Sequence, residues 1–208
     1  MRTVAQRVAP SGRKEKALKR LILASSSPRR KELLKEAGYE FEVIEPVLGE
    51  IKLHQQPPEI MVEAEAYAKA RQVVDQAADA VVIAADTLVS LGDKVIGKPE
   101  DTEQAIEFLK ELSGTTHWVI SGICLIDTAT GDRLIAYDRT QVTMAQISDS
   151  EIEEYVASGQ GLDKAGGYAI QESGDRFIKK IEGSFSNVVG LPLELLERML
   201  KALERRSS

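Results

Sequence analysis

The run AVVIAA at residues 80–85 is the segment that most restricts how this chain can fold. Its apolar side chains follow one another without a break, so a strand built from them must be covered on both faces. Asp86 and Thr87 come next, and the pattern predicts that the strand ends there. A carboxylate directly after a buried strand lies where α/β sheets place their chemistry. We therefore expect a sheet covered by helices, with Asp86 at its functional end.

Helical patterns alternate with β-rich runs along the rest of the chain. Helices are predicted from Pro28 to just before Gly38, over residues 58–74, from Asp101 as N-cap to Leu112, over 148–158 and from Pro192 onward. Strands are predicted at residues 21–24, 41–44, 116–127, 133–144 and 177–181. The runs 116–127 and 133–144 flank a turn and form an antiparallel hairpin. This order predicts an α/β fold: a mixed, twisted sheet with flanking helices and two lobes around a cleft.

Chain length and charge restrict the class of protein further. The chain has 208 residues, 43% of them hydrophobic, and no apolar stretch of the roughly 20 residues that a membrane helix needs. Residues 1–20 hold seven Lys or Arg and one acid, so the rest carries 20 basic against 32 acidic residues. An acidic body argues against nucleic-acid binding. We expect a basic, flexible leader at residues 1–20, a single domain at 21–208, and no membrane partner.

Cysteine and histidine are scarce, which narrows the possible chemistry. The single cysteine, Cys124, lies in an apolar run and fits a buried position in a reducing, cytoplasmic protein. His54 and His117 are too few and too poorly spaced for a zinc cluster or a Ser/His/Asp triad. Catalysis would have to depend on carboxylates, lysines and a metal ion.

The sequence SSSPRR at residues 25–30 predicts a helix start with Ser27 as N-cap and Pro28 as the first helical residue. Arg29 and Arg30 then fall in the first turn, where the helix dipole disfavours cations. Free N–H groups, the hydroxyls of Ser25 and Ser27 and two guanidiniums together form a cradle suited to a polyanion. Taken alone, the motif is a weak signal for phosphate binding, and a plain capping sequence is then the favoured interpretation.

Four further residues could complete a phosphate-cleaving site. Hydrolysis of a phosphoanhydride needs charge neutralisation and an oriented water, commonly with a divalent cation held by carboxylates. Asp86 and Glu50 are the candidate acids, and Lys69 and Lys98 supply positive charge. Each also has a structural interpretation: Asp86 as a turn or capping residue, Glu50 and Lys98 as exposed loop residues, and Lys69 as part of a solvated helix face.

Several motifs in series resemble the Maf family of nucleoside triphosphate pyrophosphatases over nearly the whole chain after the leader. They are LASSSPRRKELL, Glu50, AKAR with Lys69, AADT with Asp86, GKPED with Lys98, LSGTTHWVISG, DKAGGYAIQ and GSFSNVVGLPL. The resemblance implies a fold similar to inosine triphosphate pyrophosphatases. It also implies cleavage between the α and β phosphates, which releases a nucleoside monophosphate and pyrophosphate, with a divalent metal cation, Mg²⁺ or Mn²⁺, as cofactor.

The resemblance also implies roles for individual residues. Asp86 would be the proton acceptor, with Glu50, Lys69 and Lys98 completing the catalytic set and Glu50 and Asp86 holding the metal. The substrate would be bound by Ser25, Ser27, Arg29, Arg30, Thr87 and Gln171. Glu172 stands where members with these motifs usually have glycine. The family further implies a homodimer.

Gln171 suggests which base is preferred. Uracil and thymine present an acceptor at O4 beside a donor at N3, and a primary amide can answer both. We therefore expect dTTP and UTP as preferred substrates, CTP as a weaker one and purine nucleotides as poor ones. The alternative is a non-enzymatic regulator of septum formation that uses the same cleft to sense a nucleotide, since the family has been linked to cell division arrest.

Overall fold

The computed structural model describes residues 19–47, 56–170 and 172–206. In chain order the elements are β1 (Arg20–Ala24), α1 (Pro28–Glu36), β2 (Glu42–Val43), α2 (Pro58–Val74), β3 (Ala80–Leu91), β4 (Lys94–Ile96), α3 (Thr102–Leu112), β5 (Thr116–Asp127), β6 (Arg133–Met144), α4 (Asp149–Ala157), the 3₁₀ helices η1 (Ala165–Gly167) and η2 (Glu172–Phe177), β7 (Ile178–Glu182), α5 (Phe185–Val189) and α6 (Leu193–Arg206). This sequence of elements confirms the expected α/β class.

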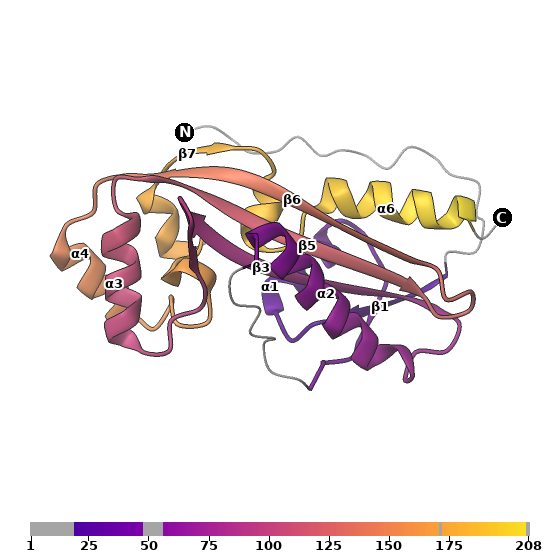
Figure 1. Cartoon of the computed structure of the whole chain (residues 1–208). Coiled ribbons are helices and arrows are strands. Elements are labelled where there is room, and N and C mark those ends of the chain that lie inside the picture. Colours follow the sequence, from indigo (N-terminus) through magenta and orange to yellow (C-terminus); the bar gives the residue numbers. More distant parts are fainter. Residues whose placement is uncertain (1–18, 48–55, 171, 207–208) are drawn as a thin grey trace.

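The described strands form one mixed, seven-stranded sheet that runs the length of the molecule (Figure 1). The strand order is β2-β1-β3-β5-β6-β7, and β4 pairs with the far end of β3. β1 is parallel to both β2 and β3, whereas β3, β5, β6 and β7 pair antiparallel. The hairpin predicted for β5 and β6 is confirmed over its full length.

The first half of β3 is buried on both faces, as its apolar run predicts. Alternate side chains belong to two separate cores: Val81, Ile83 and Ala85 pack with α6 and α1, and the intervening residues pack with α2. The strand does not end at Asp86, so that prediction is wrong. β3 continues to Leu91 because β5 pairs with it through Ser90, and Asp86 and Thr87 are half-buried positions in mid-strand.

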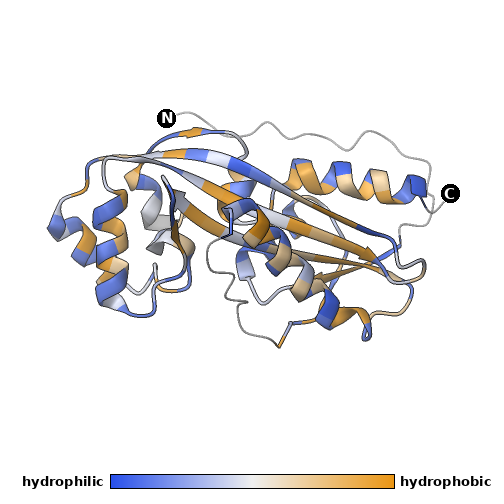
Figure 2. Ribbon diagram, in the orientation of Figure 1, coloured by the Kyte–Doolittle hydropathy of each residue, from blue (hydrophilic) through white to orange (hydrophobic). Residues whose placement is uncertain are grey.

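The continuation of β3 leads into a second lobe. Its core combines the far ends of β3, β5 and β6 with α3, α4 and the segment before β7, and includes Val89, Leu109, Met144, Tyr155 and Phe177. In Figure 1, α3 and α4 stand apart from α1, α2 and α6 at opposite ends of the long strands. Figure 2 shows hydrophobic residues concentrated on those strands and on the helix faces turned toward them. The structure thus confirms two lobes joined by one sheet.

Helix termini follow the capping signals in the sequence. The Ser27 side chain accepts from the backbone N–H of Arg30 at the start of α1, and Ser148 forms a reciprocal capping box with Glu151 at the start of α4. Asp101 caps α3, but Gln104 accepts from the N–H of Glu100 instead of closing a box on Asp101.

Five short elements differ from the sequence prediction, among them the 3₁₀ helices η1 and η2, which were not predicted. The strand expected at residues 41–44 is reduced to the two residues of β2, and β4 and α5 were not predicted. Lys19 and Arg20, assigned to the leader, take part in the fold: Lys19 pairs with the buried Asp127, and Arg20 lies in β1. Residues 1–18 lie outside the described part of the chain.

The single cysteine is buried, as its apolar surroundings in the sequence predict. Cys124, on β5 beside β3, is fully buried in the core that α2 covers, and burial raises the pKa of its thiol to about 12. It is the small buried hydrophobe expected from the sequence. Among the described residues, no helix combines the length and hydropathy needed to cross a bilayer.

Candidate active site

A cavity of about 490 Å³ lies between the two lobes. The first lobe contributes the loop from β1 into α1, one face of α2 and the middle of β3; the second contributes the loop after β4 and residues 163–170, and the end of α5 closes the cavity. Eight predicted site residues line it: Ser25, Ser27, Arg29, Arg30, Lys69, Asp86, Thr87 and Lys98. Glu50 and Gln171, which were also predicted, lie outside the described residues.

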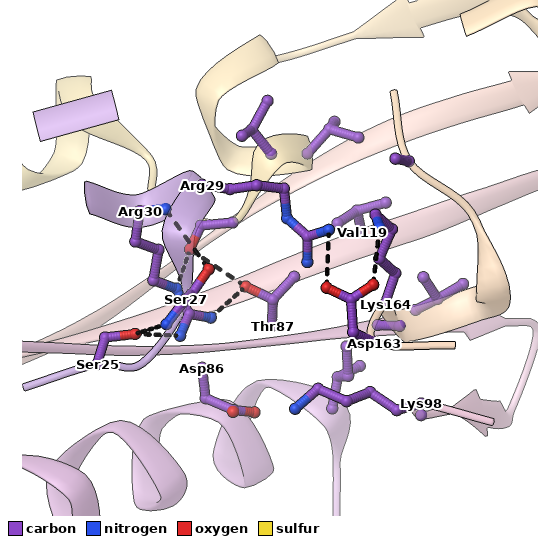
Figure 3. Close-up of a pocket in the computed structure, with 18 of the residues that line it drawn as sticks. Ser25, Ser27, Arg29, Arg30, Asp86, Thr87, Lys98, Val119, Asp163 and Lys164 are labelled. Carbon is purple, nitrogen blue, oxygen red and sulfur yellow. Dashed lines mark hydrogen bonds and ion pairs between the residues drawn. The ribbon is translucent and has the colours of Figure 1, made fainter. Parts of the chain in front are cut away.

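Lys69 and Asp86 form an ion pair in this cavity. Lys69 Nζ lies 2.5 Å from Asp86 Oδ1, and each side chain is 18% exposed. Lys69 projects from α2 and Asp86 from β3, so the pair depends on how this helix packs on the sheet. Lys98 follows β4 and extends toward the Asp86 carboxylate in Figure 3. The Asp86 carboxylate therefore lies near two ammonium groups, that of Lys69 from the first lobe and that of Lys98 from the second.

The two adjacent arginines have different surroundings. Arg30 Nε donates to Gly190 O at 2.8 Å, and its terminal nitrogens donate to Ser25 Oγ at 3.3 Å and Thr87 Oγ1 at 3.1 Å. Burial lowers the pKa of the Arg30 guanidinium, and nearby Asp86 opposes that effect. Arg30 thus ties α1 to β3 and to the residue after α5, which fixes the cavity wall.

Arg29 faces the other lobe. Its guanidinium lies 3.7 Å from the carboxylate of Asp163, in the segment before η1 (Figure 3). No acidic residue lies in the first turn of α1, so the dipole of this helix and the arginine charge are both available to an anion. If the motif served only to cap the helix, the presence of Ser27 and Pro28 would be explained, but the orientation of Arg29 toward the other lobe would not.

Comparison with protein-family models finds a match to Maf, described as Maf-like protein, over residues 20–203. This chain belongs to the Maf family. It is 42% identical over 190 residues to the dTTP/UTP pyrophosphatase of Ruminiclostridium cellulolyticum, covering 91% of this chain and 98% of the relative. It is 46% identical over 184 residues to the dTTP/UTP pyrophosphatase of Deinococcus radiodurans, covering 88% and 92%.

Among solved structures, this Maf chain is similar in fold to a HAM1 protein from Coxiella burnetii. The TM-score is 0.50 at 16% sequence identity, with 89% of this chain and 98% of the HAM1 chain covered. At that identity the likeness concerns the fold alone, and it agrees with the fold class expected from the sequence.

Five polar residues of the Maf cavity were not predicted as site residues: Ser26, Glu65, Asp163, Lys164 and Tyr168. Glu65 is 7% exposed on α2, one helical turn before Lys69, and Lys164 is 8% exposed beside Asp163. Tyr168 lies on the same second-lobe segment. Asp163, Lys164 and Tyr168 belong to the DKAGGYAIQ motif, which carried the family resemblance without individual roles. Glu65 has no such signal, because an acid within a helix usually marks a solvated face.

The carboxylates of the cavity suit Mg²⁺ or Mn²⁺ only if phosphate oxygens of the substrate supply further ligands. The described residues contain no group of three or more His, Cys, Asp or Glu side chains that could hold a metal ion. Mg²⁺, however, is usually held by one or two carboxylates together with substrate phosphates. Asp86 supplies such a carboxylate in the cavity. The residues present therefore fit a metal that enters with the nucleotide.

His117 and Tyr168, which lines the cavity, form a buried hydrogen bond. His117 Nε2 lies 2.6 Å from the Tyr168 hydroxyl, and His117 Nδ1 is buried without a hydrogen-bond partner among the described residues. Burial lowers the pKa of His117 from 6.5 to about 4. Since the unfolded chain binds a proton at higher pH than the folded chain does, acidification favours unfolding.

We expect His117 to make stability depend on pH. Its contribution is fully present above the unfolded pKa of 6.5 and is lost as pH falls toward the folded value of about 4. The free energy of unfolding should decrease by about 2 kcal/mol more in the parent protein than in His117→Gln as pH falls from about 8 to about 5. Urea titrations at each pH measure this difference. Parallel pH profiles of the two proteins would contradict it.

Proposed function

We propose that this Maf protein is a nucleoside triphosphate pyrophosphatase that hydrolyses dTTP and UTP to the nucleoside monophosphate and pyrophosphate. The observation that carries the proposal is the Lys69–Asp86 pair, which lies in a cavity walled by the cationic N-terminus of α1. The relatives in Ruminiclostridium cellulolyticum and Deinococcus radiodurans are named for this activity. A cavity of about 490 Å³ is also within the size range of small-molecule sites.

In the proposed reaction, Asp86 acts as general base. Its carboxylate accepts a proton from a water molecule as the water oxygen bonds to the α phosphorus. The bond between the α phosphorus and the oxygen that bridges the α and β phosphates breaks. Pyrophosphate leaves with that oxygen and the electron pair of the broken bond. Lys69 holds the Asp86 carboxylate at 2.5 Å, and Lys98 adds positive charge for the phosphoryl oxygens.

Asp86, together with Glu50, would hold the divalent cation. Bound there, Mg²⁺ or Mn²⁺ supplies charge neutralisation on the phosphoryl oxygens. Arg30 keeps the wall behind Asp86 and Thr87 in place through Gly190, and Ser25, Ser27 and Arg29 face the anionic part of the substrate.

The preference for dTTP and UTP rests on the names of the relatives and on the amide of Gln171. That amide can donate to O4 and accept from N3–H of a uracil or thymine base. We further place the reaction in the cytoplasm, consistent with a single buried thiol, and we propose a homodimer, which light scattering can test.

A nucleotide panel tests the proposed activity. With Mg²⁺ or Mn²⁺, the protein should release pyrophosphate fastest from dTTP and UTP, more slowly from CTP and poorly from purine triphosphates, and EDTA should abolish release. Coupled detection of pyrophosphate measures each rate. Nucleotide binding without release from any triphosphate would overturn the enzyme proposal and support the nucleotide-sensing alternative.

A further inference from the structure

Three charged side chains bridge the two lobes across the cavity. Asp163 Oδ2 lies 3.7 Å from Arg29 in the first lobe, and Asp163 Oδ1 accepts a hydrogen bond of 2.7 Å from Lys164 in the second. All three residues line the cavity. Figure 3 shows the carboxylate lying between the two cationic groups. We call this set the bridging triad.

The members of the bridging triad differ in how firmly they are held. The Lys164 side chain is only 10% exposed, and its ammonium also donates to Gln160 O. Arg29 is 23% exposed, whereas Asp163 is 63% exposed. An ion pair that is this exposed and this long contributes little to stability. Lys164 is therefore a fixed part of the cavity wall and Arg29 is largely covered, whereas the Asp163 carboxylate is the most exposed member and the one that can move.

The two cations of the triad can bind an anion that carries more charge than one carboxylate does. Burial opposes ionisation of Asp163, but Lys164 and Arg29 outweigh that effect and lower the pKa of its carboxyl group. A doubly charged phosphoryl group offers more acceptor oxygens to the same ammonium and guanidinium, and Arg binds such groups through paired hydrogen bonds. Asp163 would repel any polyphosphate that approached while it stayed in place.

We propose that Arg29 and Lys164 form the subsite for the pyrophosphate end of the nucleotide, and that Asp163 occupies this subsite until the substrate displaces it. The proposal rests on the proposed function, because it assigns the terminal phosphates of that substrate to residues of both lobes. Entry of the polyphosphate exchanges one carboxylate for a more highly charged ligand, so the two lobes become linked through the substrate. Asp163 thereby weakens the binding of any ligand whose phosphates enter the subsite, and it leaves the binding of ligands that do not reach the subsite almost unchanged.

Binding of pyrophosphate alone tests this subsite without any turnover. By calorimetry with Mg²⁺ present, Asp163→Asn should bind pyrophosphate about three- to tenfold more tightly than the parent, because a like charge is removed from the subsite. Its affinity for UMP, which lacks the terminal phosphates, should change less than twofold by the same reasoning. The matched control is Asp149→Asn, which removes a carboxylate of similar exposure, 75% against 63%, from an ion pair with Lys110 outside the cavity.

Three results would overturn the subsite. They are pyrophosphate affinity in Asp163→Asn that is unchanged or weaker than in the parent, an equal gain in UMP affinity, or an equal gain in Asp149→Asn. Of these results, weaker binding in Asp163→Asn would show in addition that the carboxylate takes part in holding the ligand.

Lys164 provides a second, independent measurement. Lys164→Gln keeps a donor for Gln160 O but loses the charge, and it should weaken pyrophosphate binding by about tenfold or more, while Lys164→Arg should retain most of it. Thermal unfolding confirms that each variant is folded before binding is measured. A folded Lys164→Gln protein with parental pyrophosphate affinity would refute the subsite. Failure of the nucleotide panel would reject the proposed activity, while these binding results would still decide the subsite.

Discussion

Replacing Asp86 by asparagine should lower turnover by about 10²–10⁴-fold while nucleotide binding is largely kept. Asparagine retains the size of the side chain and an oxygen that can accept from Lys69, so the packing between α2 and β3 is preserved. It cannot take up a proton from water, and it offers a metal ion no negative charge. Steady-state release of pyrophosphate from UTP, with calorimetric binding of a non-hydrolysable UTP analogue, separates turnover from binding.

The control for this variant is Asp132→Asn. Asp132 accepts a hydrogen bond from Thr130 in the turn between β5 and β6, outside the cavity. This change should leave turnover near the parental value. Near-normal turnover in Asp86→Asn would remove Asp86 from the chemical step, and equal losses in both variants would point to a general effect of charge.

Local sequence signals predicted most of the fold because their causes are local. Ser27 and Ser148 cap their helices through hydrogen bonds within one turn, and alternating apolar residues set the long hairpin. The extent of β3 was not predictable in this way. A charged residue after an apolar run normally ends a buried strand, but here β5 continues the pairing past Asp86, and the cavity leaves that side chain half-buried.

The candidate site was predictable where a motif combines residue types that need a ligand. The signals at Ser25–Arg30, Lys69, Asp86 and Lys98 all lead to one cavity, although they are far apart in sequence. Sequence could not separate Arg29 from Arg30, because the difference lies in tertiary contacts with Asp163 and Gly190. It also could not find Lys164 as a site residue, since its burial depends on how the second lobe packs.

One further position couples packing to chemistry. Gly122 on β5 lies opposite Asp86 and beneath α2. A Cβ atom there would lie 2.4 Å from Val62 O and 2.8 Å from Glu63 N. Both are backbone atoms, so no side-chain rotation relieves the clash and the helix itself has to move. α2 also carries Lys69, about 10 Å further along its axis.

Gly122→Ala should therefore destabilise the protein by about 3 kcal/mol and also lower turnover of the molecules that stay folded. Without a clash, alanine in a strand would be neutral or slightly stabilising, because it reduces the entropy of the unfolded chain. A shift of α2 by about 1 Å would displace Lys69 from Asp86, and misplacements of that size can cost about 10²-fold in rate. Urea denaturation measures the loss of stability. Pyrophosphate release, expressed per folded molecule, measures the loss of turnover.

Gly131→Ala separates this steric effect from ordinary loss of a glycine. Gly131 has a φ of +78° in the hairpin turn, and a Cβ atom there would meet nothing within 4 Å. Its replacement should cost only the backbone strain, about 1–2 kcal/mol, and leave turnover unchanged. If Gly122→Ala proved as stable as the parent, close contact between α2 and β5 would not be what holds Lys69 against Asp86. Loss of stability with full turnover would show that the Lys69–Asp86 pair tolerates movement of the helix.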